Sequence, residues 1–220
     1  AYLKEKYKTP KNLNETWKTA RWSLEYQSFD DVIPPVRSRW EHPSLQTEWI
    51  RFHCQNIVSY VNEQADILHA LTDAPVGTDM MMTNLLGYYE LNEKLDVVQY
   101  NHYEPYTGLP ATAFSYDFLR NVLDKPFWVT ETQVGWNGSM FANCGYRPVG
   151  SCYINTWLPI AKGAETVEYW LFRAHPNGHE LAHGALYNTG GRAYRVTEEV
   201  TRAAKEFSAC ATFLCNSGVK

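Results

Sequence analysis

The chain has 220 residues, and its 20 Lys and Arg against 24 Asp and Glu give a formal net charge of −4. A protein that binds nucleic acid through phosphate contacts needs a basic face. No cluster of basic residues forms one here, so we exclude nucleic acid as a partner. No run of about 18 apolar residues occurs, so we expect no membrane-spanning segment.

Cysteine usage bears on metals and on the compartment. The five cysteines make an odd count without any C-x-x-C pair. Zinc fingers and ribbons need paired cysteines at short spacing, and a chain of this length can bury a core without a disulfide framework. We therefore expect reduced thiols in a cytoplasmic protein, and no zinc finger or ribbon.

The first third of the chain predicts helices. Residues 12–26 have the pattern of a helix, and the following pair Pro34 and Pro35 forces an extended or turn segment. Residues 44–71 place apolar side chains at helical spacing and predict a long helix, which Ser44 can cap. No convincing strand occurs before residue 75.

The pattern then changes to short apolar runs that alternate with helical segments. Four runs predict strands, at residues 75–84, 95–103, 126–134 and 166–173. Each is followed by a helix-like segment, around residues 88–94, 110–123, 150–163 and 193–209. Strands that alternate with helices pair in parallel through right-handed crossovers.

Polar residues with catalytic potential stand at the ends of these strands. They are Asn84, the triplet 101–103, Glu131 and Arg173. In a (β/α)8 TIM barrel the active site lies at that face, and such a barrel needs eight strands and about 250 residues. Only four units are present, and the long helical opening looks like the tail of an earlier unit. We therefore expect an α/β fold in which residues 1–220 supply strands five to eight of such a barrel, with no second domain. An open doubly wound sheet is the alternative, although no glycine-rich nucleotide-binding motif follows any of the strands.

Glu131 is the strongest candidate catalytic residue. A carboxylate at the end of a buried strand is costly unless it is hydrogen-bonded or used in chemistry, and glycosidases place a Glu where it can attack an anomeric carbon. The alternative is a structural Glu that pairs with a neighbouring Arg or Lys. Tyr103, at the end of the preceding strand, can donate a hydrogen bond to a nucleophile or a sugar hydroxyl, or can be a rim aromatic.

A polar cluster follows the last strand. His175, His179, Glu180 and His183 lie within nine residues. Glu180 and His183 are three residues apart, so a helical turn would put them on one face. Three interpretations are open: a metal site, a clamp for substrate hydroxyls, or a solvated loop.

With these residues in view, the chain resembles the catalytic barrel of the β-galactosidases of glycoside hydrolase family 42. The order and spacing of several motifs together carry the resemblance. They lie at residues 3–7 with 13–17, 29–35, 51–52, 83–84, 101–103, 130–131, 172–173, and 178–180 with His183.

The resemblance implies roles for individual residues. Glu131 would be the nucleophile, and Tyr103 would hold it or the sugar. Glu180 and His183 would bind galactose hydroxyls, which weakens the metal interpretation, and we expect no metal and no cofactor. Trp170, where the family usually has Phe, would line the pocket. The nearest match to the family's Trp after the nucleophile is Trp136, although it lies closer to Glu131 than the family spacing.

The resemblance also implies what the chain lacks. The family's acid/base Glu precedes the first matching residues, so we expect it upstream of this chain. The implied function is a retaining hydrolase that removes terminal β-galactosyl residues from a β-galactoside substrate. The alternatives are a non-catalytic sugar-binding or scaffold protein, or a related β-glucosidase or arabinosidase. Unpaired sheet edges would require the missing N-terminal half or a homo-oligomer.

Overall fold

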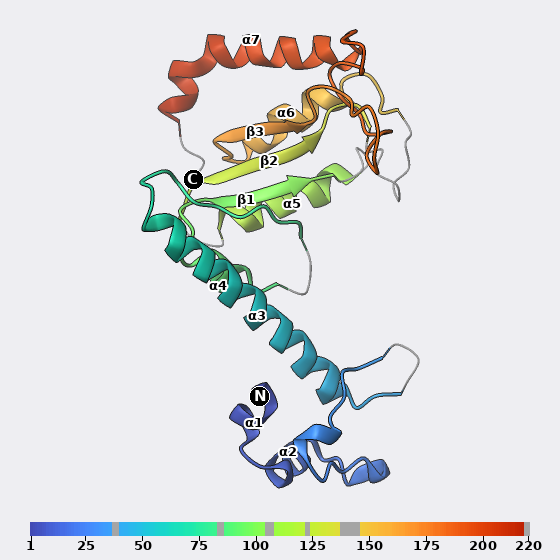
Figure 1. The fold of residues 1–220 in the computed structure, drawn as a ribbon. Coiled ribbons are helices and arrows are strands. Elements are labelled where there is room, and N and C mark those ends of the chain that lie inside the picture. The colour runs from blue at the N-terminus through green and yellow to red at the C-terminus, as the bar shows by residue number, and fades with distance from the viewer. Residues whose placement is uncertain (37–39, 83–85, 104–107, 122–123, 137–145, 218–220) are drawn as a thin grey trace. The chain divides into compact units, whose positions relative to one another are not determined.

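The computed structural model describes residues 1–36, 40–82, 86–103, 108–121, 124–136 and 146–217. The described chain divides into two compact units (Figure 1), one of residues 1–63 with 84–87 and the other of residues 64–83 with 88–220. None of the described helices is long and apolar enough to cross a membrane.

The first unit is helical. It holds α1 (Tyr2–Tyr7), α2 (Pro10–Trp17), two 3-10 turns, η1 (Arg21–Ser23) and η2 (Phe29–Asp31), and most of α3 (Pro43–His69). The predicted helix over residues 12–26 is confirmed only as far as residue 17, and its second half is wrong. The helix α2 ends at Trp17, because Lys18 adopts a left-handed conformation with φ 58°. The long helix is confirmed as α3, but its first turn is capped by His42, whose Nδ1 accepts the Ser44 N–H at 3.1 Å.

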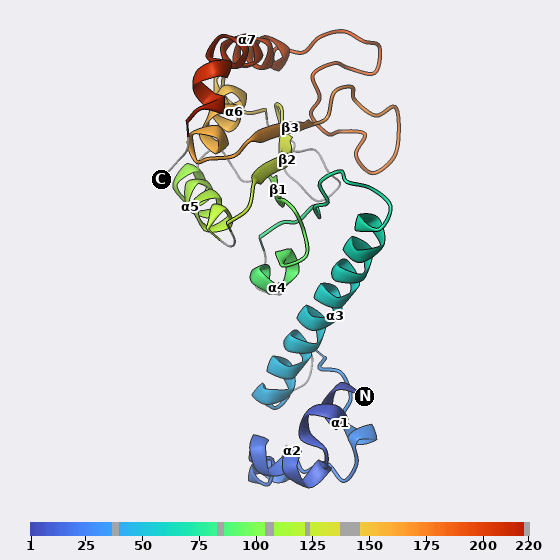
Figure 2. The same cartoon turned by 90° about the vertical axis from the view of Figure 1, so that its left-hand side faces the viewer.

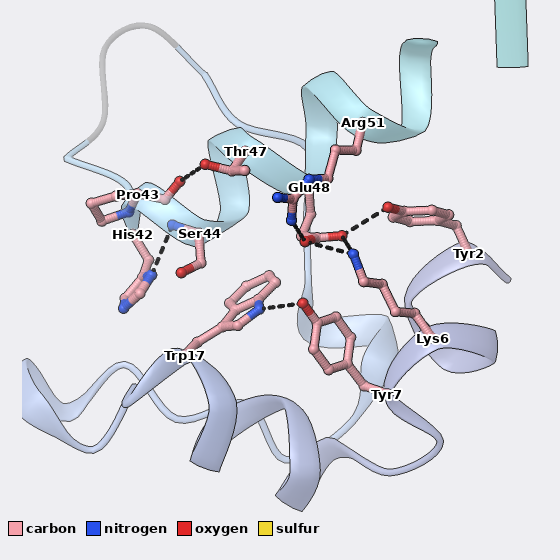
Figure 3. A network of polar contacts seen from close by, with 10 residues as sticks. All are labelled: Tyr2, Lys6, Tyr7, Trp17, His42, Pro43, Ser44, Thr47, Glu48 and Arg51. Carbon is pink, nitrogen blue, oxygen red and sulfur yellow. Dashed lines mark hydrogen bonds and ion pairs between the residues drawn. The ribbon is translucent and has the colours of Figure 1, made fainter. Parts of the chain in front are cut away.

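A buried carboxylate joins α1 to α3 in this unit (Figure 3). Glu48, on α3, has a side chain only 4% exposed. Its oxygens accept hydrogen bonds from the Tyr2 hydroxyl at 2.8 Å, from Lys6 Nζ at 2.8 and 2.9 Å, and from Arg51 Nη1 at 2.7 Å. Burial raises the pKa of Glu48, but the hydrogen bonds from these three donors together outweigh burial, so the net pKa lies below its usual value.

The second unit contains a three-stranded parallel sheet. Its strands β1 (Val98–His102), β2 (Phe127–Gln133) and β3 (Thr166–Trp170) pair in the order β1-β2-β3. Three of the four predicted strands are therefore confirmed. The predicted strand at residues 75–84 is not confirmed, because residues 75–82, the part of it that the structure describes, form no strand. That segment is irregular, although it follows β1 through two backbone hydrogen bonds, Asp96 N to Val76 O and Asn101 N to Met80 O, both 2.8 Å.

Helices cover one face of the sheet. The short α4 (Tyr88–Asn92) precedes β1, and α5 (Leu109–Arg120), α6 (Ser151–Ala161) and α7 (Val196–Cys215) follow β1, β2 and β3. Figure 2 shows α5, α6 and α7 on the same side of the sheet. The helix α5 packs on β1 and α6, and α6 packs on β2, β3 and α7.

Alternation along the strands explains this arrangement, because successive side chains point to opposite faces. Val98, Tyr100 and His102 of β1 are buried on the helix-covered face, where the ring of Tyr116 from α5 contacts Tyr100 and His102. Asn101, between them, points to the other face. The sheet and its order confirm the α/β class, and the numbering of the strands as five to eight stays a prediction, as does a single domain over residues 1–220.

Candidate active site

The candidate site lies where the parallel strands end. All three strands run in the same direction, and the segment after β3, residues 171–195, lies at their carboxyl-terminal ends (Figure 1). Parallel strands with helical crossovers gather their functional side chains at that edge. The structure places Tyr103, Glu131, Glu180 and His183 there.

The central contact joins Tyr103 to Glu131. The hydroxyl of Tyr103, just after β1, donates a hydrogen bond to Glu131 Oε2 on β2 at 2.7 Å. Burial and this bond raise the pKa of the Tyr103 hydroxyl, so it stays a donor at every working pH. The sequence left Glu131 open to a structural pairing with Arg or Lys, and its partner in the structure is this tyrosine instead.

Opposing influences act on the Glu131 carboxyl. Its burial raises the pKa, and the negative charges of Asp79 and Glu180 raise it further. The hydrogen bond from Tyr103 and the charge of His183 lower it, and the net pKa lies above the usual value. Glu131 therefore has a poorly solvated carboxylate held by one strong donor, which is a suitable state for attack on an electrophilic carbon.

Trp170 and Glu180 lie together at the end of β3. The indole N–H of Trp170 donates to Glu180 Oε2 at 2.9 Å, and His175 Nε2 lies 3.8 Å from the same oxygen. The peptide bond after Trp170 is cis. His183 is buried and packs its ring edge-on against the ring of Tyr103, with centroids 5.7 Å apart. Tyr103 therefore contacts both Glu131 and His183, whereas Trp170 and Glu180 form a separate pair whose negative charge acts on Glu131.

Trp136 is tied to the loop after β3. Its indole N–H donates to the backbone carbonyl of Ala182 at 2.6 Å, and its ring packs on Tyr146 and Tyr194. Gly184 passes so close that a Cβ there would lie 2.5 Å from the Trp136 carbonyl oxygen. Trp136 thus joins the loop after β2 to the segment that carries Glu180 and His183.

The sequence did not identify Asp79 as a site residue. Its carboxylate accepts hydrogen bonds from Asn101 Nδ2 at 2.6 Å and from Thr130 Oγ1 at 3.1 Å. The resemblance assigned the end of the first strand to residues 83–84, which lie outside the described residues. The sequence did contain one signal for Asp79: it is an acidic residue near the end of a predicted strand, just before a run of methionines.

Two further candidates have structural partners. Arg173 donates from Nε and Nη2 to the Thr189 carbonyl, at 3.0 and 2.6 Å. Within the described ranges, no three His, Cys, Asp or Glu side chains come together to hold a metal ion. The residues of the cluster at 175–183 have separate partners instead: Glu180 accepts a hydrogen bond from Trp170, and His183 packs on Tyr103.

The parallel sheet, with helices on one face and polar groups at its carboxyl end, has the design of an α/β barrel protein. Comparison with known proteins agrees. The family model described as "Beta-galactosidase", glycoside hydrolase family 42, matches residues 1–210. The chain belongs to this family, which confirms the resemblance found in the sequence.

Individual relatives are similar to this chain over nearly all of its length. β-Galactosidase YesZ of Bacillus subtilis is 29% identical over 210 residues, which cover 93% of this chain and 32% of that protein. β-Galactosidase BgaB of a Geobacillus strain is 30% identical over 218 residues, covering 93% and 31%. The chain thus spans about a third of the length of the curated relatives it matches.

Solved structures share the fold. The polyextremophilic β-galactosidase of the haloarchaeon Halorubrum lacusprofundi superposes with a TM-score of 0.84 at 27% identity, covering 94% of this chain and 34% of that one. The cold-adapted β-galactosidase of Rahnella sp. R3 gives a TM-score of 0.89 at 24% identity, covering 100% and 34%. The second likeness supports the fold alone.

Proposed function

We propose that this chain is the nucleophile-bearing part of a retaining β-galactosidase. The observation that carries the proposal is the 2.7 Å hydrogen bond from Tyr103 to Glu131 at the carboxyl-terminal edge of a parallel sheet. This hydrogen bond holds Oε2 of Glu131, and we propose that the other carboxylate oxygen attacks the sugar. The printed names of the family-42 relatives support galactose as the sugar.

The proposed reaction has two displacements, as in other retaining glycosidases. The Glu131 carboxylate attacks the anomeric carbon and forms a glycosyl ester, while the bond from that carbon to the aglycone oxygen breaks. A carboxylic acid gives its proton to the departing oxygen. Water then attacks the same carbon, gives its proton to the acid's conjugate base, and releases galactose and the Glu131 carboxylate.

The acid/base is assigned elsewhere. Among the described residues, the carboxylates that influence Glu131 are Asp79 and Glu180. Both already accept hydrogen bonds, Asp79 from Asn101 and Thr130 and Glu180 from Trp170. We therefore propose that neither of these two carboxylates is the acid/base, and that this group lies upstream of the chain, where the family resemblance puts it.

The group around Glu180 is proposed to bind the sugar. The carboxylate of Glu180 can accept from galactose hydroxyls while Trp170 fixes its orientation, and His183 can offer a ring nitrogen beside Tyr103. Trp170 and Trp136 supply flat aromatic surfaces of the kind that stack on sugar rings. Glu180 and His183 could together bind the axial hydroxyl of galactose, which in glucose is equatorial.

The edge of the sheet has a proposed partner as well. In the described residues β3 pairs only with β2, so its other edge carries unpaired backbone groups. Such an edge pairs readily with another strand. We propose that the rest of the barrel, or a second copy of the chain, occupies it. Light scattering tests this, because a monodisperse monomer without a partner would contradict it.

Covalent labelling tests the nucleophile. A dinitrophenyl 2-fluoro-galactoside has a leaving group that departs as an anion, so labelling does not need the missing acid. We expect mass spectrometry to find one galactosyl adduct, on the peptide that contains Glu131, and no adduct in Glu131→Gln. Reversible binding without an adduct would support the sugar-binding alternative. Parallel rates with the gluco and arabino reagents would separate the related glycosidases.

A further inference from the structure

The strand that carries Glu131 contains a bulge immediately before it. On one side, Tyr100 of β1 is opposite Val129 of β2, but the next residue, Asn101, is opposite Glu131. Thr130 is therefore an extra residue in β2. The register with β3 advances in the same way, since Val129 pairs with Val167 and Thr132 with Tyr169. Bulges redirect side chains and often lie beside active sites.

One carboxylate holds this bulge. Asp79 Oδ1 accepts the Thr130 hydroxyl at 3.1 Å, and Asp79 Oδ2 accepts the Asn101 side-chain amide at 2.6 Å. The other acceptor near Thr130, Asn101 Oδ1, is more distant at 3.5 Å. The Asp79 carboxylate thus binds the extra residue of β2 and the β1 residue opposite Glu131 at the same time.

The backbone fixes Asp79 in place. Asn101 N donates to the carbonyl of Met80, the next residue, at 2.8 Å. Side-chain and main-chain bonds therefore connect residues 79 and 80 to the same position of β1. Asp79 therefore connects its own segment to β1 and to β2. Glu131 is the next residue of β2 after Thr130, the residue that Asp79 binds.

We propose that Asp79 is a positioning residue for Glu131: by holding the Thr130 bulge, it aims the Glu131 carboxyl at the Tyr103 hydroxyl. This inference deepens the proposed function, because it matters for catalysis only if Glu131 is the nucleophile. Among the described residues, the titratable groups that act on Glu131 are Tyr103, His183, Glu180 and Asp79. Asp79 differs from the others in acting through the backbone of β2 as well as through its charge.

Variants of the bulge separate position from charge. Thr130→Val removes the hydroxyl but keeps the branched shape and the Asp79 charge, and Thr130→Ser restores the hydroxyl. Asp79→Ala removes both the contacts and the charge. Asp79→Asn removes the charge and keeps an acceptor for Thr130; the Asn101 amide, which now donates to Asp79, turns over so that its oxygen accepts from the new amide nitrogen. Asp73→Asn, at an exposed residue, is the matched control for losing a carboxylate.

Labelling of Glu131 by the 2-fluoro reagent is measured against pH in each variant. We expect Thr130→Val to lower the plateau rate about tenfold, the cost of one lost charge-assisted hydrogen bond. Thr130→Ser should recover most of it. Asp79→Ala should lower the rate at least as much, whereas Asp79→Asn should chiefly move the pH midpoint to lower pH. Thr130→Val and Asp79→Ala rates within twofold of Asp73→Asn would overturn the proposal.

A second measurement needs no reaction. Carbon-13 titration of the glutamate carboxyls, with Glu131 assigned from Glu131→Gln, reports the Tyr103–Glu131 bond directly. Loosening that bond removes a donor to the carboxylate, so Thr130→Val should titrate at higher pH and Thr130→Ser should not. Identical curves would overturn the positioning role. If the wild-type chain is not labelled but Thr130→Val still shifts the titration, the nucleophile role of Glu131 fails while the positioning of its carboxyl by the bulge stands.

Discussion

The hydroxyl of Tyr103 and the carboxylate of Glu131 form a 2.7 Å hydrogen bond between the ends of two adjacent parallel strands. Tyr103→Phe removes this donor, and with it one of the two influences that lower the Glu131 pKa. The reaction needs the carboxylate, so activity is lost as pH falls through that pKa. We expect the acidic limb of the labelling profile to move to higher pH. An unmoved limb would contradict the role of Tyr103.

The Trp170 indole is expected to hold Glu180 for sugar binding. Trp170→Phe keeps an aromatic ring but removes the N–H that donates to Glu180 at 2.9 Å. A lost bond to a charged group is worth roughly 1.5 kcal/mol, so galactose binding should weaken about tenfold. Trp128→Phe is the matched control, because its indole donates to Glu165 at 3.2 Å. Equal affinities for both variants by calorimetry would refute this expectation.

Gly184 is expected to tolerate no side chain. The Cβ of Gly184→Ala would meet the backbone oxygen of Trp136 at 2.5 Å, and neither backbone can move freely. We expect a loss of about 1–3 kcal/mol in the free energy of unfolding and slower labelling of Glu131. Gly190→Ala, whose Cβ would come no closer than 3.4 Å to a side-chain oxygen, should leave both unchanged. Urea denaturation compares the two variants.

His102 should make the second unit sensitive to acid. It is 1% exposed, and burial lowers its pKa from 6.5 to about 4. The unfolded chain therefore takes up a proton at a pH where the folded chain does not, and stability present above pH 6.5 is lost as pH falls towards 4. At about 1.4 kcal/mol per pKa unit the loss is roughly 3 kcal/mol. Parallel stability curves for wild type and His102→Gln would contradict this.

Glu48 should be a main stabilising group of the first unit. Glu48→Gln removes the buried carboxylate, while the cations that it pairs with, Lys6 and Arg51, are 39% and 57% exposed and can be solvated. We therefore expect a cost of about 1.5–3 kcal/mol, the range for hydrogen bonds to a charged group. Because its pKa lies below the usual value, the wild-type contribution should also decline at acid pH. Glu15→Gln removes an exposed charge 3.9 Å from Lys11 and should cost less than about 1 kcal/mol. Thermal unfolding of both variants decides the matter.

Local pattern was sufficient for the long helix α3 and for three of the four predicted strands. Each confirmed strand is a short apolar run followed by an amphipathic helix, and α3 shows helical spacing over its whole length. The end of α2 could not be read in this way. The Asn14 side chain bonds to the main chain of Tyr26 and to the Thr19 hydroxyl, and these distant contacts turn the chain after Trp17.

Within the site, residues that end a strand were predictable and residues that support them were not. Tyr103 and Glu131 each stand at or just after a predicted strand, where parallel topology brings them together. Asp79 bonds to Thr130 across 51 positions of sequence, and no local pattern indicates which distant side chain a carboxylate will meet. The sequence also could not show that Trp136 bonds to Ala182 rather than facing solvent.

The contact of Trp136 with Ala182 and Gly184 has a consequence for engineering. Trp136, after β2, donates to the backbone of Ala182 and lies against Gly184, so we expect the segments after β2 and β3 to be exchangeable only as a pair. A loop grafted from a relative after β2 should be accepted only together with its native counterpart after β3. Substrate range in this scaffold would then change by paired transplantation rather than by one loop at a time.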